Sequence, residues 1–147
     1  MKTLNEFIKE ALSDAKTYVN LICLTPDEES ALILRRANYM KKFPSQWGFP
    51  GGSVDEKDKN DLGAAIRELE EETGIKLTWN EEHNTKLFEK IINKDGSISL
   101  YYKTTLETTP EVKLSKEHSE YEWFSYHKDK TKDWMPDVFH LLQKILD

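Results

Sequence analysis

The first half of the chain alternates short apolar segments with polar turns. Residues 3–12 place apolar side chains at helical spacing and predict a short amphipathic helix. The apolar, β-branched run Tyr18–Leu24 predicts a strand, and Ala31–Leu34 predicts its returning partner across a turn at residues 26–30. Residues 38–46 are polar and predict a loop, which leads through Trp47-Gly48-Phe49 into a turn at Pro50-Gly51-Gly52.

The central segment predicts a helix with clear ends. Asp58, Asn60 and Asp61 are all acceptable N-caps, and Gly74 is a natural residue just beyond the C-terminus. The apolar spacing within the segment follows one helical face. That face comprises Leu62, Ala65, Ile66, Leu69 and Thr73.

The second half returns to strands. Leu87–Ile92 and Ser97–Leu106 predict a hairpin, because Asp95-Gly96 between them is a strong turn signal. Residues 79–84 and 108–116 predict loops, and Tyr121–Ser125 predicts a short strand. Pro136 begins a last helix whose inner face carries Val138, Leu141, Leu142 and Ile145. Strands with one helix between them and another at the end predict an α/β fold, a mixed β-sheet covered by helices on both faces.

Composition narrows the class of protein. A chain of 147 residues suits one domain, here residues 1–147, and the balance of 37% hydrophobic with 33% charged residues is typical of a globular protein with a polar surface. The net charge of −6 argues against a broad nucleic-acid-binding face. The single Cys23 excludes an internal disulfide, and no apolar run approaches a membrane span. We therefore expect a cytoplasmic protein without a membrane partner.

Four glutamates crowd into five positions of the central helix, at Glu68 and at residues 70–72. Like charges this close repel one another unless water or a cation screens them. At about 100° per residue, Glu68, Glu71 and Glu72 converge on one side of the helix and Glu70 points towards solvent. Hard divalent cations such as Mg²⁺ take oxygen ligands of this kind, and Mn²⁺ is a plausible substitute.

The glycines before the helix have a matching use. Gly51 and Gly52 can adopt positive φ and lack side chains, so that a backbone carbonyl can approach a bound ion or phosphate. An ion held there would neutralise a diphosphate, polarise a phosphorus atom and lower the pKa of a bound water. Arg67 is placed to hold a glutamate through a bidentate pair.

Residues 49–75 resemble the signature of the Nudix hydrolase family, G-x5-E-x7-R-E-U-x-E-E-x-G-U, where U is aliphatic. The second half, Arg67 to Ile75, matches fully. Counted from Gly52, the lone glutamate position of the signature holds Asp58, and the loop to Arg67 is one residue longer than usual. Asp58 and Glu56 are the two alternatives for that carboxylate. The longer loop is similar to that of coenzyme A pyrophosphatase-type members.

A second segment, residues 112–124, is similar to the LSxEHxxYxWL stretch of dinucleoside tetraphosphate hydrolases and some nucleoside triphosphate members. In the family, a loop here often supplies a further carboxylate to the metals or a base. The resemblance implies that role first for Glu117 and second for Glu120. His118 is more often a satisfied loop histidine than a base.

The family resemblance implies an α/β/α sandwich and assigns roles by position. Glu71 and Glu72 are implied metal ligands, helped by the Gly52 carbonyl, with Glu117 as a further ligand. Glu68 is a ligand or the residue that activates water, and Arg67 is an orienting residue of the catalytic group. The implied reaction is Mg²⁺-dependent attack of water on a phosphoanhydride of a nucleoside diphosphate linked to another group.

Substrate-binding candidates lie on both sides of the glycine pair. Arg35 and Arg36 can grip phosphate, although arginines at a strand end are as often simple surface residues. Trp47, Phe49 and Tyr121 are aromatic candidates for stacking on a base, with packing in the core or along a strand as the alternative.

Several functions remain open at this point. The enzyme hypothesis covers dinucleoside polyphosphates or nucleoside triphosphates, ADP-ribose-like compounds, and coenzyme A or flavin dinucleotides. Two alternatives are a non-catalytic nucleotide-sensing module and an RNA 5′-end or cap pyrophosphohydrolase. The expected partner is a small nucleotide, and a homodimer is left open.

Overall fold

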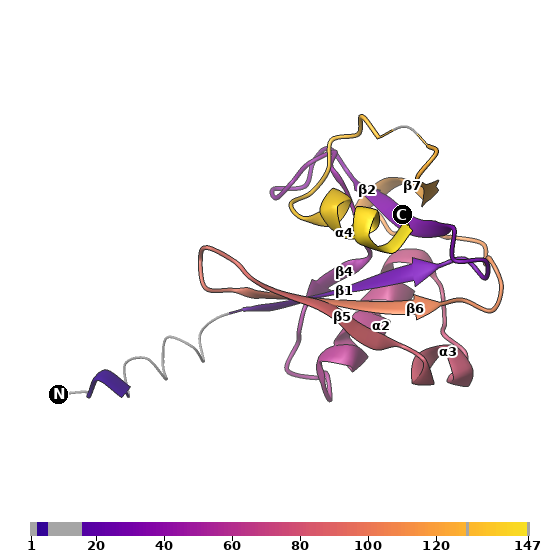
Figure 1. The fold of residues 1–147 in the computed structure, drawn as a ribbon. Helices are drawn as coiled ribbons and strands as arrows, with labels where there is room; N and C mark the ends of the chain where they lie inside the picture. Colours follow the sequence, from indigo (N-terminus) through magenta and orange to yellow (C-terminus); the bar gives the residue numbers. More distant parts are fainter. Residues whose placement is uncertain (1–2, 6–15, 129, 147) are drawn as a thin grey trace.

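The computed structural model describes residues 3–5, 16–128 and 130–146 (Figure 1). Within these residues a seven-stranded sheet follows the path β3-β2-β1-β6-β5, with β4 paired to β1 and β7 paired to β2. β1 and β6 run parallel, whereas β1 and β2 run antiparallel, so the sheet is mixed as predicted. The elements are β1 (Thr17–Leu24), β2 (Ser30–Arg36), β3 (Trp47–Gly48), β4 (Gly51–Ser53), α2 (Asp61–Thr73), α3 (Trp79–His83), β5 (Lys86–Ile92), β6 (Ile98–Thr105), β7 (His118–Ser125) and α4 (Val138–Leu146).

Strand β1 separates two hydrophobic cores because its side chains alternate between the faces of the sheet. Val19 and Leu21 pack into the core that includes the buried face of α2. Ile22 and Leu24 pack into the core that includes α4. The two helices lie on opposite sides of the sheet (Figure 1). The predicted sandwich of helix, sheet and helix is therefore confirmed.

β1 and β2 are paired only next to the turn that joins them, where Leu24 lies opposite Ala31. Beyond this point β1 pairs with β4 and β6, and β2 pairs with β3 and β7. The predicted turn at Gly51-Gly52 is wrong, since both glycines belong to β4 and Gly52 lies opposite Val19. Because the first strands separate, the edge of β1 is free to pair with this glycine backbone.

Helix α2 has the predicted ends. The side chain of Asn60 accepts a hydrogen bond from the Gly63 N–H at 2.7 Å, and Gly74 closes the helix with φ 74°. The buried face is rotated from the predicted one, however. Ala64 and Glu72 are buried, whereas Leu62 and Ile66 are only half-buried. The rotation turns one of the glutamates inwards, towards β4.

Residues 79–84 were expected to form a loop, but Trp79–His83 form helix α3. A capping box explains the difference, because the Thr78 side chain accepts from the Glu81 N–H and the Glu81 side chain accepts from the Thr78 N–H. The prediction of a helix over residues 3–12 falls mostly on residues 6–15, which lie outside the described residues.

The remaining elements confirm the predictions. β5 and β6 form an antiparallel hairpin, and Gly96 in its turn has φ 87°. β7 covers the predicted aromatic strand, and α4 buries Val138, Leu141 and Leu142. Among the described residues, no helix combines the length and apolar content that a bilayer crossing needs.

Candidate active site

The two glycines allow helix α2 to lie against strand β4. A Cβ on Gly51 would lie 2.2 Å from the carbonyl oxygen of Val19, and one on Gly52 would lie 2.5 Å from the carboxyl carbon of Glu68. Neither glycine has positive φ, so of the two properties named from the sequence the conformational freedom is not used here. The absence of a side chain is what matters at both positions. It leaves room for the Gly51 N–H to donate to Glu72 Oε1 at 2.8 Å.

Glu72 and Glu68 form an electrostatically strained pair beside these glycines. Burial is the main cause that raises the pKa of Glu72 to about 9; the Gly51 N–H opposes the rise, and the carboxylates of Glu68 and Glu117 add to it. The pKa of Glu68 is also raised, again first by burial and with a contribution from Glu117. The ionised forms of these three carboxyl groups would repel one another at one place, and a divalent cation would offset that repulsion.

The Arg67 guanidinium lies between the carboxylates of Glu68 and Glu71. Its Nη1 donates to Glu68 Oε1 at 3.1 Å and to both carboxylate oxygens of Glu71 at 3.2 Å. The Glu71 side chain is 57% exposed, whereas Glu72 is buried. The three predicted glutamates therefore do not converge on one point, because Arg67 draws Glu71 outwards.

Asp58 is the loop carboxylate that Arg67 holds. Arg67 Nε donates to Asp58 Oδ1 at 2.8 Å and Nη2 donates to Asp58 Oδ2 at 3.0 Å, which makes a bidentate pair. The Asp55 N–H donates to the same side chain at 2.7 Å. These bonds hold the pKa of Asp58 below its usual range. Glu56, the alternative, is exposed.

Glu117 reaches the cluster on a loop that is fastened to the C-terminal end of α2. The Lys113 N–H donates to the Thr73 carbonyl at 2.9 Å, and the Ser115 N–H donates to the Glu72 carbonyl at 3.1 Å. The Ala37 N–H donates to the carbonyl of Glu117 itself at 2.8 Å. Glu117 is close enough to both Glu68 and Glu72 to raise the pKa of each. Glu120, the second choice, instead pairs with Arg35 at 2.8 Å.

His118 and Arg36 lie on the other side of Glu72. The two residues are opposite each other in the pairing of β2 with β7. His118 Nε2 is 3.8 Å from Glu72 Oε2, and the side chain is only 4% exposed. Burial, with a smaller contribution from Arg36, lowers the pKa of His118 to about 4, so the imidazole is neutral near pH 7. Sequence reasoning treated His118 as an ordinary loop histidine, and its burial against Glu72 follows from strand pairing that no local pattern reveals.

The carboxylates fit a divalent cation by the type of their donor atoms. Glu68, Glu72 and Glu117 offer the hard oxygen ligands that Mg²⁺ and Mn²⁺ take. As the side chains lie, no group of three or more His, Cys, Asp or Glu among the described residues is set to hold a metal ion. Glu68 is turned towards Arg67 and Glu72 towards the Gly51 N–H. Rotation of the Glu68 and Glu72 side chains would be needed for these carboxylates to bind one ion together with Glu117.

The structure places the predicted substrate-binding residues in different environments. Trp47 and Phe49 are buried in the core that contains α4, which favours a packing role over stacking on a base. Tyr121 is 43% exposed on β7. Arg36 donates to the Lys42 carbonyl at 2.8 Å, and Arg35 donates to the Ser45 carbonyl at 3.0 Å.

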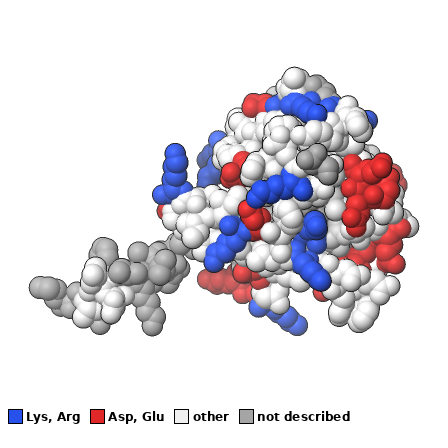
Figure 2. All heavy atoms as spheres, viewed as in Figure 1, with Lys and Arg blue, Asp and Glu red and all other residues white. Residues whose placement is uncertain are grey.

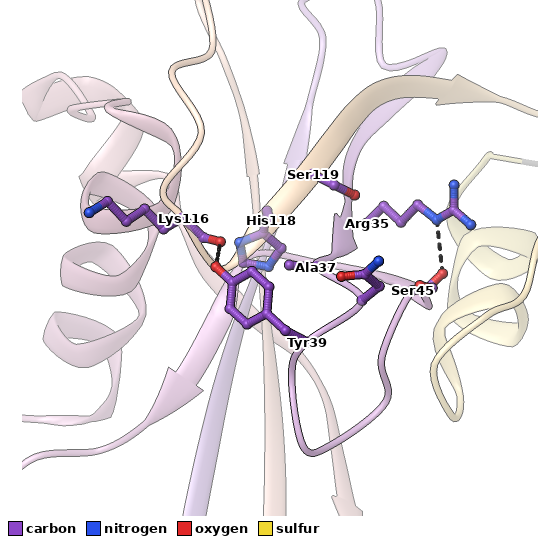
Figure 3. Close-up of a pocket in the computed structure, with 8 residues that line it drawn as sticks. Arg35, Ala37, Tyr39, Ser45, Lys116, His118 and Ser119 are labelled. Carbon is purple, nitrogen blue, oxygen red and sulfur yellow. Dashed lines mark hydrogen bonds between the residues drawn. The ribbon is translucent and has the colours of Figure 1, made fainter.

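A pocket of about 410 Å³ lies beside the acidic cluster (Figure 3). Residues of the β2 end, of the following loop and of the β7 start line it: Arg35, Ala37, Asn38, Tyr39, Ser45, Lys116, His118 and Ser119. His118 belongs both to its wall and to the surroundings of Glu72. Sequence reasoning missed Tyr39 and Lys116, since neither belongs to a motif and only the folded loops bring them together.

A NUDIX domain model matches residues 16–144 of the chain. Two curated relatives share shorter stretches. "Uncharacterized Nudix hydrolase NudL" of Enterobacter sp. (strain 638) is 46% identical over 56 residues, 37% of this chain and 29% of the relative. "mRNA decapping complex subunit 2" of Schizosaccharomyces pombe is 35% identical over 82 residues, 56% of this chain and 11% of the relative. The chain thus spans less than a third of either relative.

One solved structure is similar over nearly the whole of both chains. The NUDIX domain of Shewanella oneidensis NrtR, in complex with ADP ribose, has a TM-score of 0.73 and 18% sequence identity, with 97% of this chain and 96% of that chain covered. At this identity the similarity concerns the fold alone.

Proposed function

Because the chain belongs to the Nudix family, we propose that it hydrolyses a phosphoanhydride bond of a nucleoside diphosphate derivative with the help of Mg²⁺. The observation that carries this proposal is the acidic cluster of Glu68, Glu72 and Glu117. Glu68 and Glu72 are at least partly buried, and their pKa values are raised. Both lie against the glycines of β4, where a Cβ atom would clash with neighbouring atoms. A surface helix face with solvated glutamates would have none of these properties.

Glu68, Glu72 and Glu117 would hold the ion, and Glu71 would complete the set from the exposed side of the helix. Arg67, anchored by Asp58, acts as a positioning residue because it contacts both Glu68 and Glu71. When bound, Mg²⁺ supplies charge that offsets the diphosphate and makes a bound water more acidic. The family resemblance implies the Gly52 carbonyl as a further ligand. Gly52 belongs to β4, the short strand against which α2 lies.

The reaction balances as a simple hydrolysis. The oxygen of water forms a bond to one phosphorus, and the bond from that phosphorus to the bridging oxygen breaks. The bridging oxygen leaves with the second phosphate, and the proton of the water passes to a carboxylate of the cluster. Arg36 would bind a phosphate oxygen, and its electrostatic effect on Glu72 supports this role.

A substrate panel in ¹⁸O-labelled water tests the proposal. It contains a dinucleoside tetraphosphate, a nucleoside triphosphate, ADP-ribose, coenzyme A and FAD. ADP-ribose belongs in the panel because the NrtR domain of similar fold binds it. We expect at least one compound to be split in Mg²⁺, to stay intact in EDTA, and to yield one phosphate product with one ¹⁸O atom. Failure to turn over any compound, with Mg²⁺ or Mn²⁺, would contradict the proposal and favour a nucleotide-sensing module.

A second candidate is hydrolysis at the 5′ end of RNA. The similarity to an mRNA decapping subunit over 82 residues supports it. The face in Figure 2 does not support it, since Lys and Arg are spread there among acidic residues, and Asp and Glu gather at one side. Capped and 5′-triphosphate RNA added to the panel distinguish the two candidates. A capped RNA turned over much faster than every small nucleotide would favour the second.

A further inference from the structure

We infer that the pocket beside the acidic cluster binds the nucleoside part of the substrate, with the Tyr39 ring as a platform on which the base stacks. The inference rests on the proposed function and makes it more specific, because it assigns a nucleoside site to residues outside the family signature. The volume of the pocket, about 410 Å³, lies in the range of small-molecule sites.

Tyr39 has the properties that a stacking platform needs. The residue is 65% exposed, so that a ring face is open to a ligand. Its hydroxyl donates to the Lys116 carbonyl, which fixes the ring between two loops (Figure 3). A ring that is already held loses little conformational freedom when a base stacks on it. Stacking on an aromatic side chain is tolerant of base identity, because every base has a π-face.

The opposite wall offers polar and cationic groups. The Arg35 guanidinium donates to the Ser45 carbonyl at 3.0 Å (Figure 3). It also donates to Glu120 at 2.8 Å. Asn38 lines the pocket from an exposed position, and its amide can both donate and accept. Ser45 has φ 62°, a conformation that is costly outside glycine and is found preferentially at functional sites.

His118 supplies a buried polar atom that lacks a protein partner. Its side chain is only 4% exposed, and within the described part of the chain Nδ1 has no hydrogen-bond partner. Buried polar atoms of this kind are rare unless a ligand or water serves them. The opposite ring nitrogen lies 3.8 Å from Glu72, so one imidazole separates the pocket from the carboxylates. A nucleoside in the pocket would therefore have its phosphates next to Glu72 and Glu117.

Binding of nucleoside 5′-monophosphates, which need no turnover, tests this site. The probes are AMP, GMP, CMP and UMP, with the dissociation constant of each measured by calorimetry for the full chain. We expect Tyr39→Ala to weaken the tightest of them by about tenfold or more, as loss of one base–aromatic stack does. Tyr39→Phe keeps the ring but loses the bond to Lys116, so its affinity should lie between those of the wild type and Tyr39→Ala. Trp79→Ala, a control at a 71% exposed aromatic on α3, should bind as the wild type does.

Three results would overturn the site: no monophosphate binds the wild type, Tyr39→Ala binds like the wild type, or Tyr39→Phe is as weak as Tyr39→Ala. Amide chemical shifts of the wild-type protein give a check that depends on no variant. Addition of the best monophosphate should shift residues 37–39, 45 and 116–119, and shifts confined to other regions would also overturn the site. Turnover of the panel with monophosphate binding elsewhere refutes the pocket alone. Binding in the pocket without turnover refutes the proposed hydrolysis alone.

Discussion

Arg67 contacts three carboxylates at once and so sets how two glutamates of α2 are oriented. It pairs with Asp58 through two bonds of 2.8 and 3.0 Å, and its Nη1 reaches both Glu68 and Glu71. The family resemblance implied an orienting role for Arg67, which stays a prediction, and the structure gives its contacts with the helix carboxylates. The sequence could not decide between Asp58 and Glu56, because the extra loop residue changes which carboxylate reaches the guanidinium.

The pair of Asp58 and Arg67 gives a pH-dependent contribution to stability. Arg67 holds the pKa of Asp58 below the ordinary value of 3.8, so the stabilisation is present above pH 3.8 and is lost as the pH falls through the folded-state pKa. We expect Asp58→Asn to lower the thermal midpoint at pH 7, and the difference from the wild type to shrink towards pH 2.5. Thermal unfolding followed by circular dichroism across this range measures it.

Glu56→Gln serves as the matched control, since Glu56 is an exposed carboxylate in the same loop. It should unfold like the wild type at every pH. If the thermal midpoints of Asp58→Asn and the wild type differ as much at pH 2.5 as at pH 7, the ion pair of Asp58 with Arg67 is not the cause of the difference.

Neighbouring glutamates on one helix have different environments for reasons that lie outside the helix. Helical geometry alone groups Glu68, Glu71 and Glu72. Glu72 is buried because β4 and the loop of residues 113–118 cover it, whereas Glu71 stays 57% exposed. The candidate ligands were therefore predictable as a set, and their individual burial was not.

At the scale of elements, the approach of α2 to β4 is the feature that builds the site. A Cβ on Gly52 would lie 2.5 Å from both the Glu68 carboxyl carbon and its Oε1. We expect Gly52→Ala to displace Glu68 and to lower kcat/KM on the best panel substrate by about 100-fold, the size of effect that a misplacement of about 1 Å can have. Steady-state rates at saturating Mg²⁺ measure this.

Gly63→Ala is the control for this change. Its Cβ would meet only the side-chain oxygen of Asn60, at 3.2 Å, at the far end of the same helix. It should keep kcat/KM near the wild-type value. Equal activity of Gly52→Ala and the wild type would show that the close contact with Glu68 has no part in catalysis.

Local signals predicted most elements, and pairing between distant segments explains the errors. The caps of α2 and the Asp95-Gly96 turn are local and were predicted correctly. The capping box at Thr78 and Glu81 is also local, but it was overlooked within a polar stretch. The assignment of Gly51-Gly52 to β4 depends on β1, some thirty residues earlier, and no turn rule contains that information.

At the scale of the whole molecule, one hydrophobic core lies on each face of the sheet, and α2, which carries the acidic residues, packs into one of them. The order of strands and helices along the chain predicted the helix, sheet and helix layers, and the structure shows one hydrophobic core on each face of β1. The sequence did not show that the β2 end, the β7 start and the end of α2 meet at one place. That meeting brings Glu117 and His118 to Glu72 and forms the pocket. The assignment of residues 1–147 to one domain and the homodimer stay predictions.

The most direct test of the account is the binding of Mn²⁺, followed by the electron paramagnetic resonance signal of the free ion, which requires no knowledge of the substrate. Glu72→Gln removes the carboxyl group that could ionise to hold a cation and keeps an oxygen that can accept from the Gly51 N–H. The control Glu70→Gln neutralises an exposed glutamate of the same helix that faces Lys76 at 3.6 Å.

The account predicts that Glu72→Gln raises the Kd for Mn²⁺ by about tenfold or more, since even outer partners of metal ligands have effects of that size. Glu70→Gln should bind Mn²⁺ as the wild type does. Unchanged Mn²⁺ binding by a folded Glu72→Gln protein, or equal weakening in both variants, would contradict the metal site on which the proposed hydrolysis depends.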